Sequence, residues 1–424
     1  MRRMRRLYAV VAAMVLATSN LVAAESGDKE FKFDLYGFVR SDLFYNDRAS
    51  FAPVNELFYM YPYDENLDPN GEDINDTSSA GFFSIISRMG VNISGPSIGA
   101  AETTAKIEID FGGFGAYNTI LRIRQAYINM AWENGHTLII GQTWDPLFGE
   151  VMPTMTDISV GAPFQPFSRS PQLRYQYRTG GLKLIAAALC QLQYTSNGPS
   201  GSTNAYMINS TIPELFVGAD YYAGDFMFGF GADLLHITPR TVSATGYKVD
   251  ELMAAYTGEV HMRYQSGRLR VALKSVLGSA LDSHLMVGGY GVTSESTATG
   301  EWEYTPFYDS SSWLSVSYGE KWRPHFFVGY TKNLGTTEAL LSADKVYGFG
   351  VGSTLDSDTT SNDAIDQLLG VMIGFTYNRS RWSAGIEYAS TTAWYGDLVL
   401  STGRVTNTHD ITSGRIAGNV SYNF

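Results

Sequence analysis

Cysteine, charge and long apolar runs are all scarce in this chain. Its 424 residues include one cysteine, and charged residues make up 17%, below the roughly 25% of ordinary soluble domains. A single cysteine excludes a disulfide framework and any metal site with several cysteine ligands. Beyond the N-terminus the chain has no apolar run of about 18 residues, which excludes a bundle of membrane-spanning helices.

Aromatic residues and glycine are abundant instead. The chain has 27 Tyr, 23 Phe and 43 Gly, and 44% of its residues are apolar. A composition this apolar and aromatic can bury enough surface to fold, which excludes a disordered chain.

Residues 1–24 have the pattern of a secretory signal peptide. Four arginines lie within residues 2–6, a short apolar core follows over residues 7–16, and small residues precede Glu25. The apolar core is about half the length of a membrane-spanning helix. Without this segment, residues 25–424 carry 26 basic and 42 acidic residues, a net charge of −16, so nucleic acid is not an expected partner.

A period of two recurs along the rest of the chain. In the last segment, apolar residues and one glycine occupy alternate positions from Ile416 to Phe424, and polar or small residues occupy the positions between them. Residues 105–111, 173–178 and 268–274 show the same alternation. This period predicts β-strands with one apolar face and one polar face.

Short and long connections alternate between these segments. Together with a first strand over residues 33–46 and a last strand ending at Phe424, they predict sixteen strands with both termini on the side of the short turns. An apolar segment at 285–290 leaves eighteen strands as an alternative. The expected short turns are 95–99, 133–136, 179–181, 223–225, 265–267, 319–321 and 378–381, and the expected long loops are 47–82, 112–119, 145–170, 195–212, 239–249, 280–310, 334–365 and 395–412.

Such a pattern fits an all-β transmembrane antiparallel β-barrel. Lipid accepts the apolar face, and closure of the sheet leaves no unpaired edge in the bilayer. Sixteen strands enclose more space than side chains fill, which leaves an aqueous lumen where charged residues remain in water. A large soluble β-sandwich or jelly roll also alternates, and it is the competing interpretation.

Several short motifs resemble the Gram-negative trimeric porins. They are FDLYGFVR at 33–40, SRMG at 87–90, RIRQAY at 122–127 with GQTW at 141–144, and VSYNF at 420–424. The DcaP-like porin family is the most similar group, although the coiled-coil heptads that some of its members carry near the N-terminus are absent here. The resemblance implies a trimeric diffusion channel whose last strand, with Tyr422 and Phe424, is read by the barrel-assembly machinery.

The same resemblance implies that the third extracellular loop, residues 145–170 here, folds inward and narrows the lumen. Its charges would be Asp145, Glu150, Asp157 and Arg169, with Arg88, Arg122, Arg124, Arg174 and Arg178 on the surrounding strands. A basic wall that faces an acidic loop creates a transverse field, and guanidinium groups bind carboxylates well. A second interpretation stays open, in which these arginines pair with lumen acids such as Glu108 and Asp110.

The sequence therefore predicts a porin of the bacterial outer membrane that passes small hydrophilic solutes passively, with no enzymatic activity and no cofactor or metal. A preference for anions such as carboxylates is one form of it, and a substrate-selective anion porin is a second. An outer-membrane barrel enzyme and a non-conducting adhesive or structural barrel are alternatives of another class. Expected partners are two further copies in a homotrimer, outer-membrane lipid and lipopolysaccharide.

Other signals are weaker. The G-x-S-x-G sequence at 95–99 lies in a turn between expected strands, so it lacks the strand-to-helix context of a nucleophile elbow. Acidic and amide residues crowd positions 64–76, but Pro69 and Asn75 break the EF-hand register, and Ca²⁺ binding there stays an open alternative.

Overall fold

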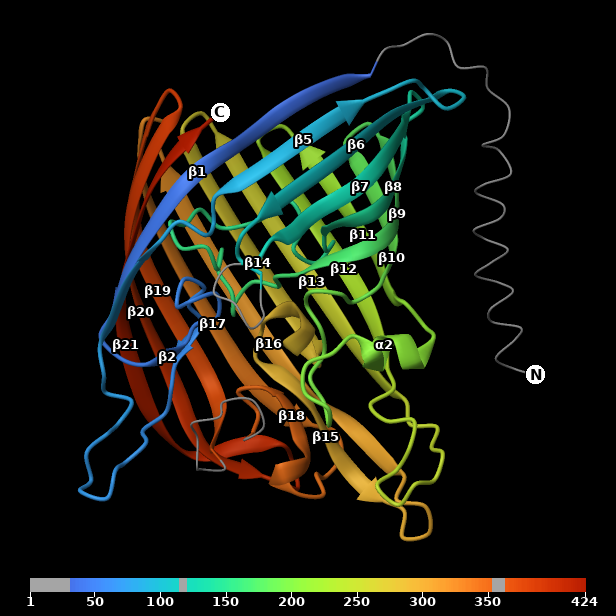
Figure 1. The fold of residues 1–424 in the computed structure, drawn as a ribbon, viewed down its shortest axis with the longest axis vertical. Coiled ribbons are helices and arrows are strands. Elements are labelled where there is room, and N and C mark those ends of the chain that lie inside the picture. The colour runs from blue at the N-terminus through green and yellow to red at the C-terminus, as the bar shows by residue number, and fades with distance from the viewer. Residues whose placement is uncertain (1–30, 114–119, 353–362) are drawn as a thin grey trace.

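The chain forms a closed antiparallel β-barrel (Figure 1). This computed structural model describes residues 31–113, 120–352 and 363–424, so the expected signal peptide at 1–24 lies outside the described residues. Each wall strand pairs with its neighbours in the wall, and β1 closes the wall by pairing with β21. Within the described residues the wall strands are β1 (Lys32–Asn46), β5 (Arg88–Ser94), β6 (Ala101–Asp110), β7 (Arg122–Trp132), β8 (His136–Trp144), β9 (Arg169–Thr179), β10 (Leu182–Leu189), β11 (Glu214–Ala223), β12 (Phe226–Ile237), β13 (Met253–Ser266), β14 (Leu269–Ser279), β16 (Trp302–Tyr318), β17 (Trp322–Thr336), β19 (Asp363–Arg379), β20 (Trp382–Val399) and β21 (Arg404–Asn423).

This wall confirms the prediction of sixteen strands. The segment expected as an extra strand, 285–290, follows η1 (Leu281–His284), and its last three residues begin β15 (Gly288–Glu295). Strand β15 pairs with β16 and with β18 (Val346–Phe349), and it does not enter the closed wall. The remaining short elements are β2 (Ser50–Phe51), β3 (Tyr61–Pro62), β4 (Ser79–Phe83), α2 (Ala205–Ser210) and η2 (Ala343–Lys345).

All seven short turns lie where the sequence predicts them. Figure 1 shows these turns and the C-terminus at one end of the barrel and the long connections at the other. Six of the turns contain a glycine with positive φ, such as Gly135 (φ 88), and the seventh uses Ser380 (φ 53). Glycine adopts this conformation without the steric cost that a Cβ atom brings, which is why these turns are readable from the sequence.

The prediction of a long loop over residues 395–412 is wrong. Strands β20 and β21 continue as a pair through this region, with Tyr395 opposite His409 and Asp397 opposite Thr406, and only residues 400–403 connect them. Its polar side chains suggested a loop, but a strand that extends beyond the bilayer is solvated and needs no apolar face.

The two faces of the wall have opposite polarity. Outward side chains are apolar and exposed, as with Leu35 (74%) and Val39 (58%), whereas inward side chains such as Glu108 (3%) and Lys274 (1%) are charged and buried. A soluble protein has the reverse arrangement, because water solvates its surface and apolar groups form its core. The outer surface therefore fits lipid, and the soluble sandwich is excluded.

The main apolar cluster lies inside the barrel. Residues of the connection after β8 pack there against wall residues, as Phe164 does against Phe327, and residues of the connection after β1 join them. Among the residues that the structure describes, no helix has the length and apolarity needed to cross a membrane.

Candidate pore constriction

The connection between β8 and β9, residues 145–168, folds into the barrel interior; we call it the constriction loop. Its two ends meet where the Asp145 N–H donates to the Ser168 carbonyl at 3.0 Å. Its middle reaches distant strands: the Thr154 N–H donates to Ser315 Oγ on β16 at 3.1 Å. The inward-folded loop that the resemblance implies is thus present.

A cavity of about 690 Å³ lies between this loop and the wall of β1, β5 and β7; we call it the passage. Its wall side carries arginines, and its loop side carries Met152, Met155 and Ile158. Basic wall residues are Arg40, Arg88, Arg122 and Arg124, and aromatic residues at the passage are Phe38, Phe51, Phe58, Trp144, Phe148, Phe167, Tyr194 and Phe349.

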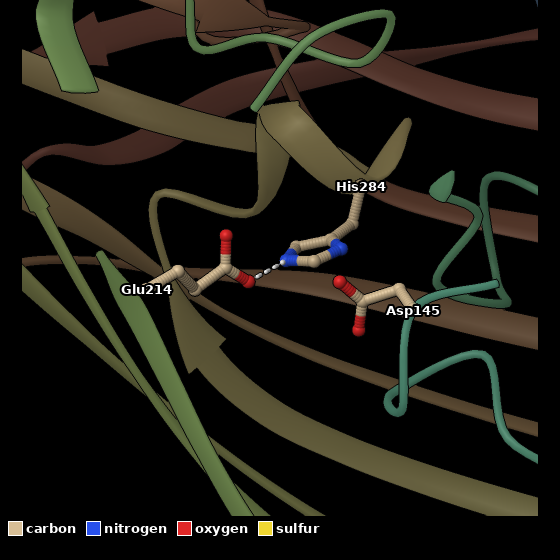
Figure 2. A group of neighbouring side chains, drawn as sticks. All are labelled: Asp145, Glu214 and His284. Atoms are coloured by element: carbon tan, nitrogen blue, oxygen red, sulfur yellow. Dashed lines mark ion pairs between the residues drawn. The ribbon is translucent and has the colours of Figure 1, made fainter. Parts of the chain in front are cut away.

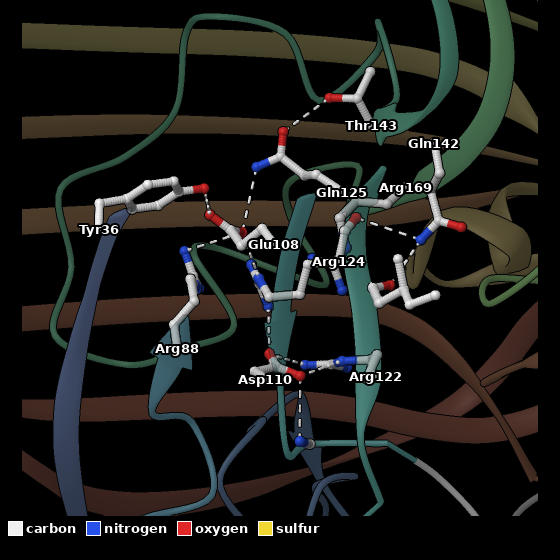
Figure 3. A network of polar contacts seen from close by, with 12 residues as sticks. Tyr36, Arg88, Glu108, Asp110, Arg122, Arg124, Gln125, Gln142, Thr143 and Arg169 are labelled. Carbon is white, nitrogen blue, oxygen red and sulfur yellow. Dashed lines mark hydrogen bonds and ion pairs between the residues drawn. The ribbon is translucent and has the colours of Figure 1, made fainter. Parts of the chain in front are cut away.

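The arginines of β7 are held by two buried carboxylates of β6 (Figure 3). Arg122 donates two hydrogen bonds to Asp110, at 2.9 and 2.8 Å. Arg124 bridges both acids, at 3.0 Å to Glu108 and 2.8 Å to Asp110. Antiparallel pairing of β6 with β7 places Asp110 opposite Arg122, so the register of the two strands builds this network.

Three further residues contact Glu108, and one of them is Gln125, whose Nε2 donates to the carboxylate at 3.3 Å. Tyr36 on β1 donates its hydroxyl to Glu108 at 2.9 Å, and Arg88 on β5 lies 3.6 Å from the same carboxylate. Arg88 is the most loosely held of these arginines, because its side chain stays 24% exposed and its Nε has no hydrogen-bond partner in the described part of the chain.

Positive charge exceeds negative charge in this part of the wall. Arg88, Arg122, Arg124 and Arg169 are four cations, and Glu108 and Asp110 are two anions. Both interpretations from the sequence therefore apply in part. The arginines do pair with Glu108 and Asp110, and a positive charge remains after that pairing.

Arg169 lies behind the passage and does not line it. Its guanidinium is fully buried, donates to the Tyr194 hydroxyl at 2.5 Å and stacks 4.6 Å from the Trp144 ring. Cation–π contacts of this kind stabilise a buried guanidinium. Arg169 can therefore act on a solute only through its field.

The acids of the constriction loop are directed at other walls, away from the passage arginines. Glu150 pairs with Lys183 at 2.6 Å and accepts from the Tyr222 hydroxyl at 2.9 Å. Burial works to raise the pKa of Glu150, but Lys183 outweighs it and holds that pKa below its usual value. An acidic loop face opposite a basic wall is thus not what the geometry shows.

Asp157 anchors the loop to β21. Its carboxylate accepts from Arg415 Nε at 3.1 Å, and both side chains are buried. Burial raises the pKa of Asp157, Arg415 works to lower it, and Glu387 raises it further. Although Asp157 touches the passage, its charge is paired.

Arg174 and Arg178 do not line the passage either. Arg174 donates to the Trp144 carbonyl and to Gln172, and it lies beneath the loop beside a second cavity of about 140 Å³. Arg178 is exposed near a short turn and stacks on Tyr222. A strand rises about 3.3 Å per residue, so the nine positions from Arg169 place Arg178 about 30 Å further along β9.

The sequence analysis missed Arg40 and the aromatic lining. Arg40 pairs with Asp42 at 2.5 Å and donates to the Thr156 carbonyl of the loop at 3.0 Å. Its position in the FVRSD segment of β1 signals an inward charge by alternation with Val39. Phe51, Phe58 and Phe349 come from other connections, and no local pattern places them at the passage.

The two C-terminal aromatic residues lie on the outer face. Tyr422 packs on Trp382 with ring centroids 5.0 Å apart, and Phe424 is 46% exposed. Phe424 also exchanges backbone hydrogen bonds with Gly37, at 3.0 and 3.2 Å. The last residue therefore takes part in closing the barrel.

The acidic stretch at 64–76 forms turns in the first long connection. Asp68 accepts the N–H groups of Asn70 and Glu72, and Asp73 accepts from Arg48 at 2.6 Å. These carboxylates serve as turn caps and ion-pair partners in the fold.

An apolar outer face, a charged interior and an inward-folded loop give this chain the architecture of a transmembrane β-barrel. Structure comparison finds the same fold in the outer membrane channel DcaP of Acinetobacter baumannii, with a TM-score of 0.66, 18% identity, and coverage of 95% of this chain and 100% of that chain. An anion-selective porin from Comamonas acidovorans matches with a TM-score of 0.53, 10% identity, and coverage of 93% and 100%. OmpT of Vibrio cholerae in its trimer form matches with a TM-score of 0.52, 12% identity, and coverage of 93% and 100%. No protein-family model and no curated protein sequence matches the chain.

Proposed function

We propose that this protein is a porin of the bacterial outer membrane that passes small hydrophilic solutes and ions by passive diffusion. The observation that carries the proposal is the arginine-lined passage inside a closed barrel whose outer face is apolar. Charged side chains along an interior wall are costly unless a counter-charge, water or an ionic solute reaches them, and the wall has more arginines than carboxylates to pair with them. The solute gradient supplies the driving force, and no reacting group is required.

We further propose a preference for anions such as carboxylates. Four arginines against two carboxylates leave the wall with a net positive charge, which raises the local concentration of anions. The methionine and aromatic residues of the opposite side favour a solute that also has an apolar part. Arg88, Arg122 and Arg124, joined by Arg40, are the residues that we expect to meet the solute.

A homotrimer within lipopolysaccharide-containing membrane is the proposed assembly, with the barrel-assembly machinery as a transient partner. The wall is uneven, since β5 has 7 residues and β21 has 20. The short strands on the β5 side make the wall lower there. A low side fits contact with a neighbouring barrel, because a side that is covered by another barrel does not have to span the full thickness of the lipid. The OmpT protein of Vibrio cholerae, which has the same fold, is described in a trimer form.

Liposome swelling tests the channel proposal directly. Purified protein reconstituted into liposomes should admit a neutral pentose, and should admit benzoate faster than benzylammonium, which has a similar size and the opposite charge. A swelling rate that saturates as the benzoate concentration rises would identify a substrate-selective anion porin. Folded protein that inserts without admitting any solute would contradict it and favour the barrel enzyme or the adhesive barrel.

A further inference from the structure

Three side chains of ligand type converge where the constriction loop joins the wall. Asp145 opens the loop, Glu214 begins β11, and His284 ends η1. One ligand atom from each lies within 4.8 Å of the others, and all three side chains are buried. Figure 2 shows the carboxylates of Asp145 and Glu214 directed at the imidazole ring of His284.

Some of the carboxyl oxygens at this point lack hydrogen-bond donors. Asp145 is 2% exposed, and while its Oδ1 accepts the Leu147 N–H at 2.8 Å, its Oδ2 has no hydrogen-bond partner in the described part of the chain. The Oδ1 of neighbouring Asp233, a residue 7% exposed, also lacks one. A buried carboxylate oxygen without a donor is costly, so a proton or a cation is required there.

Negative charge is in excess around the imidazole. Asp145, Glu214 and Asp233 interact electrostatically with one another, and His284 lies among them.

The nearby cations Lys274 and Arg174 interact electrostatically with Asp145, but they donate their hydrogen bonds to other groups. Lys274 donates to the carbonyls of Leu147 and Phe148, and Arg174 donates to Gln172 and to the Trp144 carbonyl. Neither makes a hydrogen bond to Asp145 or Glu214 among the contacts of the described residues.

A second group of the same residue types shows the contrast. His261 lies 3.0 Å from Asp220 through one ring nitrogen and 3.0 Å from Glu259 through the other. Lys183 lies 3.4 Å from Asp220, and Lys274 lies 3.8 Å from Glu259. These carboxylates have their donors and counter-charges, so that group is complete without a metal.

We propose that Asp145, Glu214 and His284 bind a Zn²⁺ ion at the neck of the constriction loop. Imidazole and carboxylate are ligands that Zn²⁺ accepts. His284 Nε2 lies 3.4 Å from Glu214 Oε1, close to the separation of about 3.4 Å between two ligands of a tetrahedral ion with bonds of about 2.1 Å. Asp145 needs to approach by an ångström or so, and Asp233 or a water molecule takes the fourth position.

The ion would fix the loop at both ends. Asp145 is the first residue of the loop, and near its other end the Phe167 N–H donates to the His284 carbonyl at 2.8 Å. A metal held by Asp145, His284 and the wall residue Glu214 therefore ties the loop to the barrel.

Zn²⁺ titration of untagged, chelator-treated protein in detergent tests this site. We expect one Zn²⁺ per chain by calorimetry and a rise in the unfolding temperature on loading. Asp145→Asn and His284→Gln should each weaken binding at least about tenfold. The matched control His261→Gln, which alters the other buried imidazole between two carboxylates, should bind Zn²⁺ like the unaltered protein.

Circular dichroism should first establish that each variant is folded, and Glu214→Gln replaces any variant that is not. The proposal is overturned if the unaltered folded protein does not bind Zn²⁺, or if the ligand variants bind it as tightly. Loss of binding in His261→Gln alone would move the site to the second group and equally contradict the assignment. Each readout is binding or stability, so it is independent of whether the barrel conducts.

Discussion

The arginines of the passage differ in how firmly carboxylates hold them. Arg122 and Arg124 make charge-assisted hydrogen bonds to buried acids, whereas Arg88 has one weak carboxylate contact, at 3.6 Å, and lies 5.0 Å from the Phe38 ring. Breaking a buried pair leaves an uncompensated charge and is strongly destabilising. Substitution of Arg88 should therefore change the charge of the passage with the smallest effect on the stability of the barrel.

Arg88→Gln should lower the anion preference while changing stability by less than about 1 kcal/mol. Its guanidinium faces the passage, and its removal takes one of the excess positive charges. Reversal potentials and thermal unfolding in detergent measure the two effects. Arg178→Gln, at an exposed site far along β9, is the control, and an equal loss of selectivity there would contradict the assignment of Arg88.

Asp157→Asn should destabilise the protein by about 3 kcal/mol, because it leaves buried Arg415 without its carboxylate. Arg415 keeps its bond to Asn46 Oδ1 at 2.7 Å, so the barrel itself should still close. Denaturant unfolding of the refolded protein measures the loss. Asp68→Asn, at an exposed turn, is the comparison; a similar loss in both variants would show that the ion pair is not responsible.

At the scale of elements, local patterns predict the wall well and the interior poorly. Alternation predicts strands such as β6, and glycines such as Gly135 predict the turns, since both signals depend on neighbouring residues. The loop contacts join positions far apart, as with Asp157 and Arg415, which are 258 positions apart. No local signal reports such a contact, so the acids of the loop were expected at the arginines and lie against other walls.

The stability of the first long connection, residues 47–87, should depend on pH. Burial works to raise the pKa of Asp73, but the Asn66 N–H and then Arg48 outweigh it and hold the pKa below its usual value. A lowered pKa in the folded state contributes stability that is present above the usual value of about 4 and is lost as the pH falls below it.

Pepsin cleavage between residues 51 and 76 should therefore rise as the pH falls from about 4 to about 2. Asp73→Asn removes the titrating group, so this variant should be cleaved fast over the whole pH range. Its cleavage rate should change with pH only as the activity of pepsin itself changes. Mass spectrometry of the fragments gives the sites. If the cleavage rate of the unaltered protein rises no more than the activity of pepsin does over this range, the role of Asp73 is contradicted.

For the whole molecule, closure depends on the two ends of the chain. Phe424 exchanges backbone hydrogen bonds with Gly37 and presents an exposed ring beside the seam of β1 and β21. We expect Phe424→Ala to reduce the amount of protein in the outer membrane several-fold, because we propose that the assembly machinery reads this aromatic ring. Refolding in detergent should change little, since the backbone bonds remain.

Quantitative blotting of membrane fractions against refolding yield in vitro separates these two effects. Val420→Ala, which truncates another outward residue of β21, is the control. Equal losses in both variants, or a loss of refolding that matches the loss in the membrane, would assign Phe424 a purely structural role.

The most direct test of an anion-conducting, arginine-lined passage is the reversal potential of the purified protein in a planar bilayer under a tenfold KCl gradient. A charged passage within a closed barrel should give stepwise conductance, and the excess of arginine over carboxylate should set the sign of the potential for chloride permeation. We predict anion selectivity in the unaltered protein and a shift of the reversal potential toward zero in Arg88→Gln. Conductance with cation selectivity would contradict the arginine passage, and insertion of folded protein without current would contradict the porin itself.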